Sequence, residues 1–267
     1  MASDQPDPGR TFARDEGRHV FGTAAALYAA ARPGYPDRVY EILRDRCRLD
    51  PSTRVLEIGA GTGQATKRLA ELAGSVLAVE PSDALAAHLR ARLTTANVEF
   101  IEAPFEDVDL PPSSFDLVVA ATAFHWLDPA VALPKVASVL RPGAWLALWW
   151  NVFGDPSLPD PFHDATEPLL RDLEIGPGGH SHALEVTARG RELSDHGFQD
   201  VEHEAIPWTL HLDATQTRQL YATFSNIARL PDARRAAILD DIERIADVEF
   251  GGRVDRQMVT PIYTAHR

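Results

Sequence analysis

The stretch 53–63 constrains the fold of this chain more than any other. It is a short apolar-rich run, Thr53-Arg54-Val55-Leu56-Glu57-Ile58, which ends in glycines at alternating positions, Gly59, Gly61 and Gly63. Glycine adopts positive φ at no steric cost and lets a ligand approach the main chain closely. Residues 64–73 then carry apolar side chains at helical spacing. The sequence therefore predicts a strand, a ligand-cradling turn and a helix, in that order.

Three classes of ligand use such a corner, and the spacing of the glycines discriminates among them. A phosphate-binding P-loop ends in Gly-Lys-Ser or Gly-Lys-Thr, whereas this chain has Gly63-Gln64-Ala65. A dinucleotide fingerprint places its third glycine where Gln64 stands, and that glycine allows close helix–strand packing over a pyrophosphate. The P-loop is excluded, and the dinucleotide fingerprint is weakened but stays open.

The remaining pattern is Glu-x-Gly-x-Gly-x-Gly, which runs from Glu57 to Gly63. It resembles motif I of the class I S-adenosylmethionine-dependent methyltransferases, in which the methionine and ribose portions of the cofactor lie across the turn. The resemblance covers about residues 20–150 and, more loosely, the end of the chain. It implies that S-adenosyl-L-methionine is the cofactor and that Glu57 and the three glycines contact it.

An acidic residue supports an adenosine ligand independently of the glycines. Residues 75–80 read as a second strand that ends in Glu80, about 20 residues past the turn, where a carboxylate accepts hydrogen bonds from ribose hydroxyls. This spacing does not separate S-adenosylmethionine from NAD, since both carry a ribose diol. Pro81 and Ser82 follow and complete the expected ribose-binding corner, and Ser82 or Asp83 can cap a helix over residues 84–93.

The N-terminal part supplies candidates for the methionine end of the cofactor. An alanine-rich helix is expected over residues 20–31, with Tyr28 in it, and it stops at Arg32-Pro33-Gly34-Tyr35-Pro36. This segment resembles one in small-molecule methyltransferases where a tyrosine and an arginine close over the methionine. Arg32 is the candidate because a guanidinium presents a planar pair of donors to a carboxylate. The alternative is a surface arginine before a proline turn.

The turn after a third expected strand, residues 98–102, is where family members often hold the adenine with an aspartate. Pro104 occupies that position here. The resemblance therefore implies that Glu106, or the backbone with Phe105 against the ring, replaces the missing carboxylate. A structural turn with a core phenylalanine is the alternative.

Residues 115–122 form a continuous apolar run, as expected for a strand buried on both faces of a parallel sheet. The segment Ala121 to Trp126 that ends it resembles motif IV of the methyltransferase type 11 subgroup that includes trans-aconitate methyltransferase. It would lie beside the transferable methyl group. His125 is the candidate general base, because histidine accepts a proton near neutral pH. The alternative is a histidine that packs beside Trp126.

The predicted fold is α/β, a doubly wound seven-stranded sheet whose last strand is antiparallel, with helical lid insertions. Residues 1–18 are expected to be a disordered tail and 19–150 the cofactor-binding core. Residues 151–188 read as an insertion, and 189–267 as the end of the core with a second insertion at about 212–252. Residues 129–141 are expected to form a helix broken by Pro134, followed by a strand over 144–150.

Composition narrows the function further. The chain has 26 Lys and Arg against 39 Asp and Glu, a formal net charge of −13, which disfavours nucleic acid as a partner. No metal-ligand spacing, signal peptide or membrane-spanning run is recognisable. The single cysteine, Cys47, is expected to be a free thiol whose pKa the neighbouring Arg46 and Arg48 could lower. A cytoplasmic protein is expected.

The sequence thus predicts methyl transfer to a small molecule, with oxygen or carboxylate acceptors slightly ahead of nitrogen and carbon. A nicotinamide-dependent oxidoreductase and a non-catalytic cofactor-binding protein of the same fold stay open as alternatives. Nothing in the sequence indicates the oligomeric state.

Overall fold

The computed structural model describes residues 25–155, 157–173 and 182–267. The expected tail, residues 1–18, lies outside this part. Within the described residues, eight strands form one sheet, in which seven follow the order β3-β2-β1-β4-β5-β8-β6 and β7 pairs with β8. The strands are β1 Arg54–Ile58, β2 Ser75–Glu80, β3 Val98–Glu102, β4 Phe115–Ala121, β5 Leu140–Trp149, β6 Val152–Phe153, β7 Gln199–Asp213 and β8 Arg253–His266.

Strands β1 to β5 pair in parallel, and β8 runs antiparallel to both β5 and β7. This confirms the doubly wound sheet with an antiparallel last strand. The two-residue strand β6, which pairs with β8, brings the number of strands in the described part of the chain to eight, where seven were expected. The predicted bounds of β2 and β3 are those observed.

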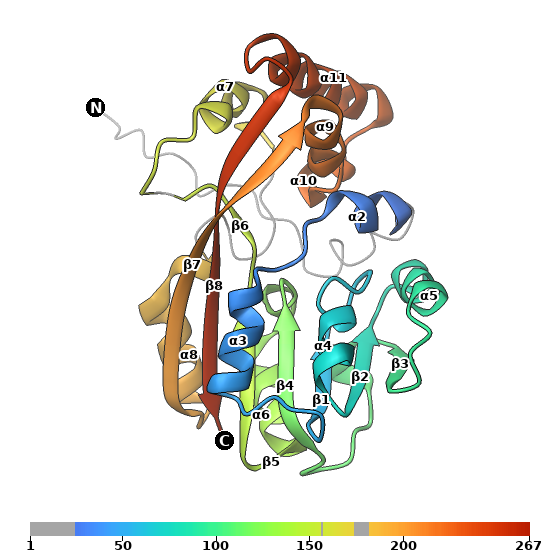
Figure 1. The fold of residues 1–267 in the computed structure, drawn as a ribbon, viewed down its shortest axis with the longest axis vertical. Coiled ribbons are helices and arrows are strands. Elements are labelled where there is room, and N and C mark those ends of the chain that lie inside the picture. The colour runs from blue at the N-terminus through green and yellow to red at the C-terminus, as the bar shows by residue number, and fades with distance from the viewer. Residues whose placement is uncertain (1–24, 156, 174–181) are drawn as a thin grey trace, which may run out of the picture.

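Helices cover both faces of the sheet (Figure 1). The described helices are α2 Ala25–Ala31, α3 Asp37–Asp45, α4 Thr66–Leu72, α5 Asp83–Arg92, α6 Pro129–Val139, α7 Pro161–Leu170, α8 Val186–Asp195, α9 Ala214–Ala222, α10 Ser225–Ala228 and α11 Asp232–Val248. The described residues also contain short 3-10 turns in the connections between elements, η2 Phe105–Asp107, η3 Phe124–Trp126 and η4 His182–Leu184.

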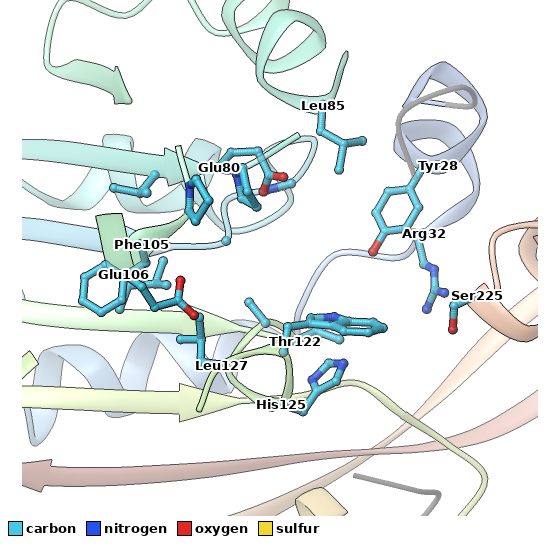
Figure 2. Close-up of a pocket in the computed structure, with 18 residues that line it drawn as sticks. Tyr28, Arg32, Glu80, Leu85, Phe105, Glu106, Thr122, His125, Leu127 and Ser225 are labelled. Atoms are coloured by element: carbon cyan, nitrogen blue, oxygen red, sulfur yellow. The ribbon is translucent and has the colours of Figure 1, made fainter. Parts of the chain in front are cut away.

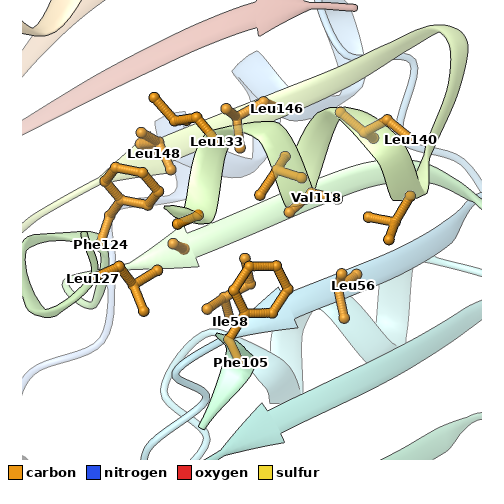
Figure 3. Close-up of a cluster of buried hydrophobic side chains, with 14 of the residues drawn as sticks. Leu56, Ile58, Phe105, Val118, Phe124, Leu127, Leu133, Leu140, Leu146 and Leu148 are labelled. Carbon is orange, nitrogen blue, oxygen red and sulfur yellow. The ribbon is translucent and has the colours of Figure 1, made fainter. Parts of the chain in front are cut away.

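Two apolar layers hold the helices to the sheet. On one face, residues of α3 and α4 pack against β1, β4 and β5. On the other face, α6 and α8 pack against the same strands, and Figure 3 shows part of that cluster. Strand β4 is fully buried from Leu117 to Ala120 because it contributes to both layers. The carboxyl ends of β1, β2 and β4 are thereby held in fixed positions.

Helix α6 differs from the prediction. Pro134 lies inside a continuous helix that ends at Val139, and residues 140–143 already belong to β5. Proline removes one backbone donor but fixes a φ value that a helix can use. Leu133 and Val136, on either side of it, are fully buried against the sheet. We infer that this packing offsets the lost hydrogen bond.

Helices α7, α9, α10 and α11 gather around the far ends of the long strands β7 and β8, beyond the carboxyl edge of the sheet (Figure 1). They have a hydrophobic cluster of their own, built around Phe162, Tyr221 and Ile242. Arg256 of β8 is 2% exposed and bonds to Asp160 at 3.0 Å and to the Tyr221 hydroxyl at 2.6 Å. We call these four helices the cap.

Cys47 follows α3 and is 2% exposed. Cys47 is a free thiol, as expected, and burial raises its pKa more than the neighbouring Arg46 lowers it, so the arginines do not activate it. Among the described residues, no helix is long and apolar enough to cross a bilayer, and no cluster of three or more acidic, histidine or cysteine side chains can hold a metal ion.

Candidate active site

A pocket lies at the carboxyl ends of β1, β2 and β4, which is where open α/β sheets bind ligands. Its floor is the glycine turn after β1. Tyr28 from α2, Arg32 directly after α2 and Ser225 from α10 line the opposite side (Figure 2). A second pocket shares Arg32 and Gly61 with the first one. Its lining also includes Glu57 and Asn151.

The glycine turn needs its glycines for two different reasons. Gly59 has φ of 71°, and a Cβ on it would stand 2.5 Å from the Cβ of Ala123, so it permits close approach of the segment after β4. Gly61 has φ of 59°, but a Cβ there would meet nothing within 4 Å. Gly61 therefore leaves open space at the pocket floor, which suits a ligand lying across the main chain.

Glu80 is anchored to this turn. It is 6% exposed, and its carboxylate accepts from the amide of Gly61 at 2.8 Å and from the amide of Ser82 at 2.9 Å. A carboxylate oxygen accepts more than one hydrogen bond, so this anchoring also orients Glu80 for hydroxyl donors in the pocket. Pro81 lines the pocket beside it.

Two predicted contacts do not line the pocket. Ser82 is buried and caps α5 by accepting from the amide of Leu85 at 3.5 Å. Gly63 is buried with φ of 92°, and a Cβ on it would lie 2.4 Å from Leu89. Both residues support the turn from behind, so motif spacing alone could not separate them from the residues that face the ligand.

Glu57 and Arg32 bring two unsatisfied polar atoms to the inner end of the pocket. Oε2 of Glu57 and Nε of Arg32 are buried and have no hydrogen-bond partner among the described residues. Burial raises the pKa of the Glu57 carboxyl to about 8, and the Thr66 hydroxyl opposes that rise. A cationic group placed beside Glu57 would favour its ionised form, and an anion would satisfy Arg32.

The guanidinium of Arg32 packs against three aromatic rings, one of which belongs to the segment between the cap helices α9 and α10. Its guanidinium carbon lies 5.2, 5.7 and 5.0 Å from the ring centres of Tyr28, Phe153 and Phe224. Its Nη2 donates to the carbonyl of Thr223 at 3.0 Å. Arg32 is thus not a loose surface arginine, because contacts from α2, β6 and the cap fix its position.

Thr122, directly after β4, is a site residue that the sequence reading did not single out. It is β-branched, yet its φ is 54°, a conformation that costs free energy unless its surroundings enforce it. Its hydroxyl accepts from the Tyr35 hydroxyl at 3.0 Å and from the amide of Asn151 at 3.3 Å. These partners are distant in the chain, so no local pattern could have revealed the network.

His125 lies on η3, at the lower side of the pocket in Figure 2. Its ring packs on Trp126 at 4.9 Å, and its Nδ1 accepts from the indole of Trp150 at 3.1 Å. His125 thus lines the pocket and also packs beside Trp126, so the general-base hypothesis and its packing alternative both stay predictions.

The remaining predicted residues divide between the two ends of the pocket. Phe105 is only 2% exposed and belongs to the main core, although its edge lines the pocket with Glu106. Ala121 lines the inner end near Glu57. Of the predicted set, the structure brings together Tyr28, Arg32, Glu57, Gly59, Gly61, Glu80, Pro81, Phe105, Glu106, Ala121 and His125.

Comparison of the sequence with known proteins shows which family the chain belongs to. A model of the methyltransferase domain matches residues 56–148. An uncharacterized methyltransferase of Mycobacterium tuberculosis is 33% identical over 227 residues, which cover 84% of this chain and 84% of that protein. The chain belongs to the S-adenosylmethionine-dependent methyltransferases. An uncharacterized methyltransferase of Schizosaccharomyces pombe is 27% identical over 263 residues, 93% of this chain and 97% of that one.

Solved structures agree with the methyltransferase fold. Phosphoethanolamine N-methyltransferase 2 of Haemonchus contortus, in complex with S-adenosylhomocysteine, aligns at a TM-score of 0.60 and 16% identity over 94% of this chain and 60% of that one. The cyclase SpnF aligns at 0.58 and 20% identity over 98% and 99%. At these identities the likeness shows the fold alone.

The family identifies S-adenosylmethionine as the cofactor of this methyltransferase, and the oxidoreductase alternative is set aside. The pocket residues fit that molecule. An unsatisfied carboxylate oxygen and an unsatisfied guanidinium nitrogen suit the ammonium and carboxylate of its methionine end, and the open space above Gly61 suits its close approach to the main chain. Membership of the trans-aconitate subgroup stays a prediction.

Proposed function

We propose that this methyltransferase methylates a small molecule at an oxygen, with a carboxylate as the favoured acceptor, by in-line displacement. The observation that carries the proposal is that His125 and Trp126 line the same pocket as Gly61 and Glu80. An acceptor between η3 and α2 would thus lie within the space that also receives the cofactor. Holding the two reactants in one enclosed space is the main catalytic contribution that such a displacement requires.

The cofactor would be held along the pocket from Glu106 to Arg32. Phe105 and Glu106 would border the adenine, Glu80 and Pro81 the ribose, and Gly59, Gly61 and Ala121 the sulfur side. Glu57 would accept from the ammonium group, while Arg32, with Tyr28 beside it, would donate to the carboxylate. When bound, S-adenosylmethionine supplies an electrophilic methyl group on a sulfonium, whose C–S bond breaks as the acceptor's lone pair forms the new bond.

Two features favour a small acceptor over a polymer. Tyr28 of α2, Arg32 just after it and Ser225 of α10 stand over the pocket, so an acceptor has to fit beneath these segments. The net charge of −13 repels a phosphate backbone over the range of the field. Apolar walls from Ile58, Trp126 and Leu127 would contact the carbon part of the acceptor.

An oxygen acceptor is favoured over a nitrogen acceptor because a carboxylate has no proton to lose before it attacks the methyl group. A carboxylate offers a lone pair at neutral pH, whereas an alkylammonium has to lose a proton before it can attack. Close to Thr122, His125 is the lining side chain best suited to take such a proton, but its Nδ1 is already bonded to Trp150. An acceptor that needs no base suits this arrangement better.

The proposal is tested with a methyl-labelled donor and a panel of organic acids, alcohols, phenols and amines. We expect transfer to at least one acid, with the label released as volatile methanol in alkali, as a methyl ester requires. An alkali-stable product formed only from amines would contradict the oxygen assignment. Binding of the cofactor without transfer to any member would favour the non-catalytic alternative.

A further inference from the structure

Asn151, two residues past the end of β5, joins the sheet to the segment that carries Arg32. Its side-chain Nδ2 donates to the carbonyl of Gly34 at 2.9 Å, and its Oδ1 accepts from the hydroxyl of Thr260 on β8 at 2.8 Å. Gly34 lies 117 positions earlier in the chain and only two positions after Arg32. One side chain thus connects the sheet with a residue that lines the inner end of the pocket.

The partners of the Asn151 amide set its orientation. The indole of Trp208 on β7 donates to the Thr260 hydroxyl at 2.9 Å, and an indole nitrogen can only donate. The proton of the Thr260 hydroxyl is therefore directed at Oδ1 of Asn151. A carbonyl oxygen only accepts, so the NH₂ group of the amide has to face Gly34. Exchanging the two ends of the amide would place two oxygens opposite each other at Gly34.

Tyr35 attaches the same segment to the sheet at a second point. Its hydroxyl donates to the Thr122 hydroxyl at 3.0 Å, and its ring stands edge-on to Trp149 at a centroid distance of 5.7 Å. The backbone amide of Asn151 donates to the same Thr122 hydroxyl at 3.3 Å. Both attachments therefore reach Thr122, which follows β4 and lines the pocket (Figure 2).

The backbone between Arg32 and these attachments is stiff. Pro33 lies between Arg32 and Gly34, and Pro36 follows two residues later. Proline fixes its own φ and disfavours helical backbone at the residue before it, and α2 accordingly ends before Arg32. A displacement of the Gly34 carbonyl is therefore passed on to Arg32, because the residues between them have few alternative conformations.

We propose that Asn151 is a positioning residue that holds Arg32 over the methionine end of the cofactor by fixing the carbonyl of Gly34. The proposal rests on the proposed function, which assigns that end of the cofactor to Arg32. The cap supplies a second restraint, because Nη2 of Arg32 donates to the carbonyl of Thr223 at 3.0 Å. With the sheet on one side and the cap on the other, the guanidinium is in place before the cofactor binds, which lowers the cost of ordering it.

The affinities of the full chain for two ligands test this role, since only one ligand carries the amino-acid end. Asn151→Ala removes both side-chain hydrogen bonds, whereas Asn151→Asp keeps an acceptor for Thr260 but has no donor for Gly34. Calorimetry should show that each variant binds S-adenosylhomocysteine about 5- to 30-fold more weakly, as for a lost hydrogen-bond partner. Affinity for 5′-methylthioadenosine should stay within about twofold, which also shows that the variants are folded.

Asn97 provides a matched control. Its side-chain amide likewise donates to backbone carbonyls, those of Ala70 and Ala73, at 2.8 and 3.2 Å. It directly precedes the amino end of β3 and lines neither pocket. Asn97→Ala should therefore leave both affinities within about twofold of the values for the unaltered chain.

A double-mutant cycle with Arg32→Leu shows whether Asn151 acts through the arginine. In the Arg32→Leu chain, Asn151→Ala should weaken binding of S-adenosylhomocysteine by no more than about twofold further. Equal weakening of both ligands by Asn151→Ala, or the same loss with and without Arg32, would overturn the proposal while leaving the proposed function intact. If the unaltered chain binds neither ligand, the proposed function fails and this proposal fails with it.

Discussion

At the scale of single residues, the inner end of the pocket holds two buried polar atoms with opposite requirements. Oε2 of Glu57 needs a donor and Nε of Arg32 needs an acceptor, and both line the space beneath α2. Leaving a buried polar group unsatisfied costs about 1–3 kcal/mol. A zwitterionic ligand end would satisfy both atoms at once, which is why we assign the methionine portion of the cofactor to this end.

Glu57 makes the stability of the ligand-free chain depend on pH. Its pKa is raised from 4.5 to about 8 in the folded state, so the folded chain holds this proton more tightly than the unfolded chain. The resulting contribution is complete below about pH 4.5 and is lost as the pH rises to about 8. Relative to Glu57→Gln, the unaltered chain should become less stable across this window, by up to about 1.4 kcal/mol per pH unit.

Urea unfolding of both proteins at pH 5.5, 6.5 and 7.5 measures this difference, since titration of other groups cancels in the comparison. A difference between the two proteins that stays constant with pH would show that Glu57 is ionised in the folded state.

Arg32 can be tested with two ligands that differ only at the end it is proposed to hold. Arg32→Leu should weaken binding of S-adenosylhomocysteine by about 10- to 100-fold, because a charge-assisted hydrogen bond contributes about 1.5–3 kcal/mol. Binding of 5′-methylthioadenosine, which lacks the amino-acid end, should change little. Calorimetry gives both affinities. An equal loss for the two ligands would mean that Arg32 only supports the pocket through Phe224 and Thr223.

At the scale of elements, the site depends on the close approach of the turn after β1 to the segment after β4. The sequence predicts some of the elements that meet there. The apolar runs of β2 and β3 and the glycine turn are local patterns, and the sequence predicts all three correctly. The hydrogen bond from Tyr35 to Thr122 spans 87 positions, and the continuous α6 depends on burial of residues around Pro134. Such features depend on tertiary packing, which a local pattern does not contain.

Gly59 and Gly61 offer a matched pair for testing that approach. Alanine is strained at both positions because φ is positive, at a cost of roughly 1–2 kcal/mol. Only at Gly59 does the new Cβ also meet Ala123, so Gly59→Ala should lose about 1–3 kcal/mol more in urea unfolding than Gly61→Ala. A second substitution, Ala123→Gly, should restore part of the lost stability when it is combined with Gly59→Ala. It should give no such rescue when it is combined with Gly61→Ala. If Gly59→Ala and Gly61→Ala lose the same stability and Ala123→Gly rescues neither, the close approach of Gly59 to Ala123 is refuted.

At the scale of the whole molecule, the cap and the sheet share the long strands β7 and β8, and Arg256 joins them. Its side chain is 3% exposed and pairs with Asp160, the N-cap residue of α7, while Tyr221 of α9 bonds to the same guanidinium. Removing one partner of a buried pair leaves an uncompensated charge. The position of Arg32, which bonds to the cap at Thr223, would then depend indirectly on this pair.

Arg256→Met should therefore lower the free energy of unfolding by about 3–5 kcal/mol and speed hydrogen exchange in α7, α9 and α11. Arg253→Met is the control on the same strand, because the Arg253 side chain is 72% exposed, and exposed pairs contribute only about 0–1 kcal/mol. Similar effects of the two substitutions would show that the buried pair does not hold the cap.

The central claim is that the glycine turn receives S-adenosylmethionine and brings its methyl group to His125 and Trp126. Calorimetric titration of S-adenosylmethionine and of NADH into the unaltered chain and into Gly61→Val tests it most directly. We predict that the unaltered chain binds S-adenosylmethionine and not NADH, and that Gly61→Val stays folded but loses binding, because a branched side chain would fill the pocket floor at a strained φ. Binding of NADH in its place, or undiminished affinity in Gly61→Val, would contradict the claim.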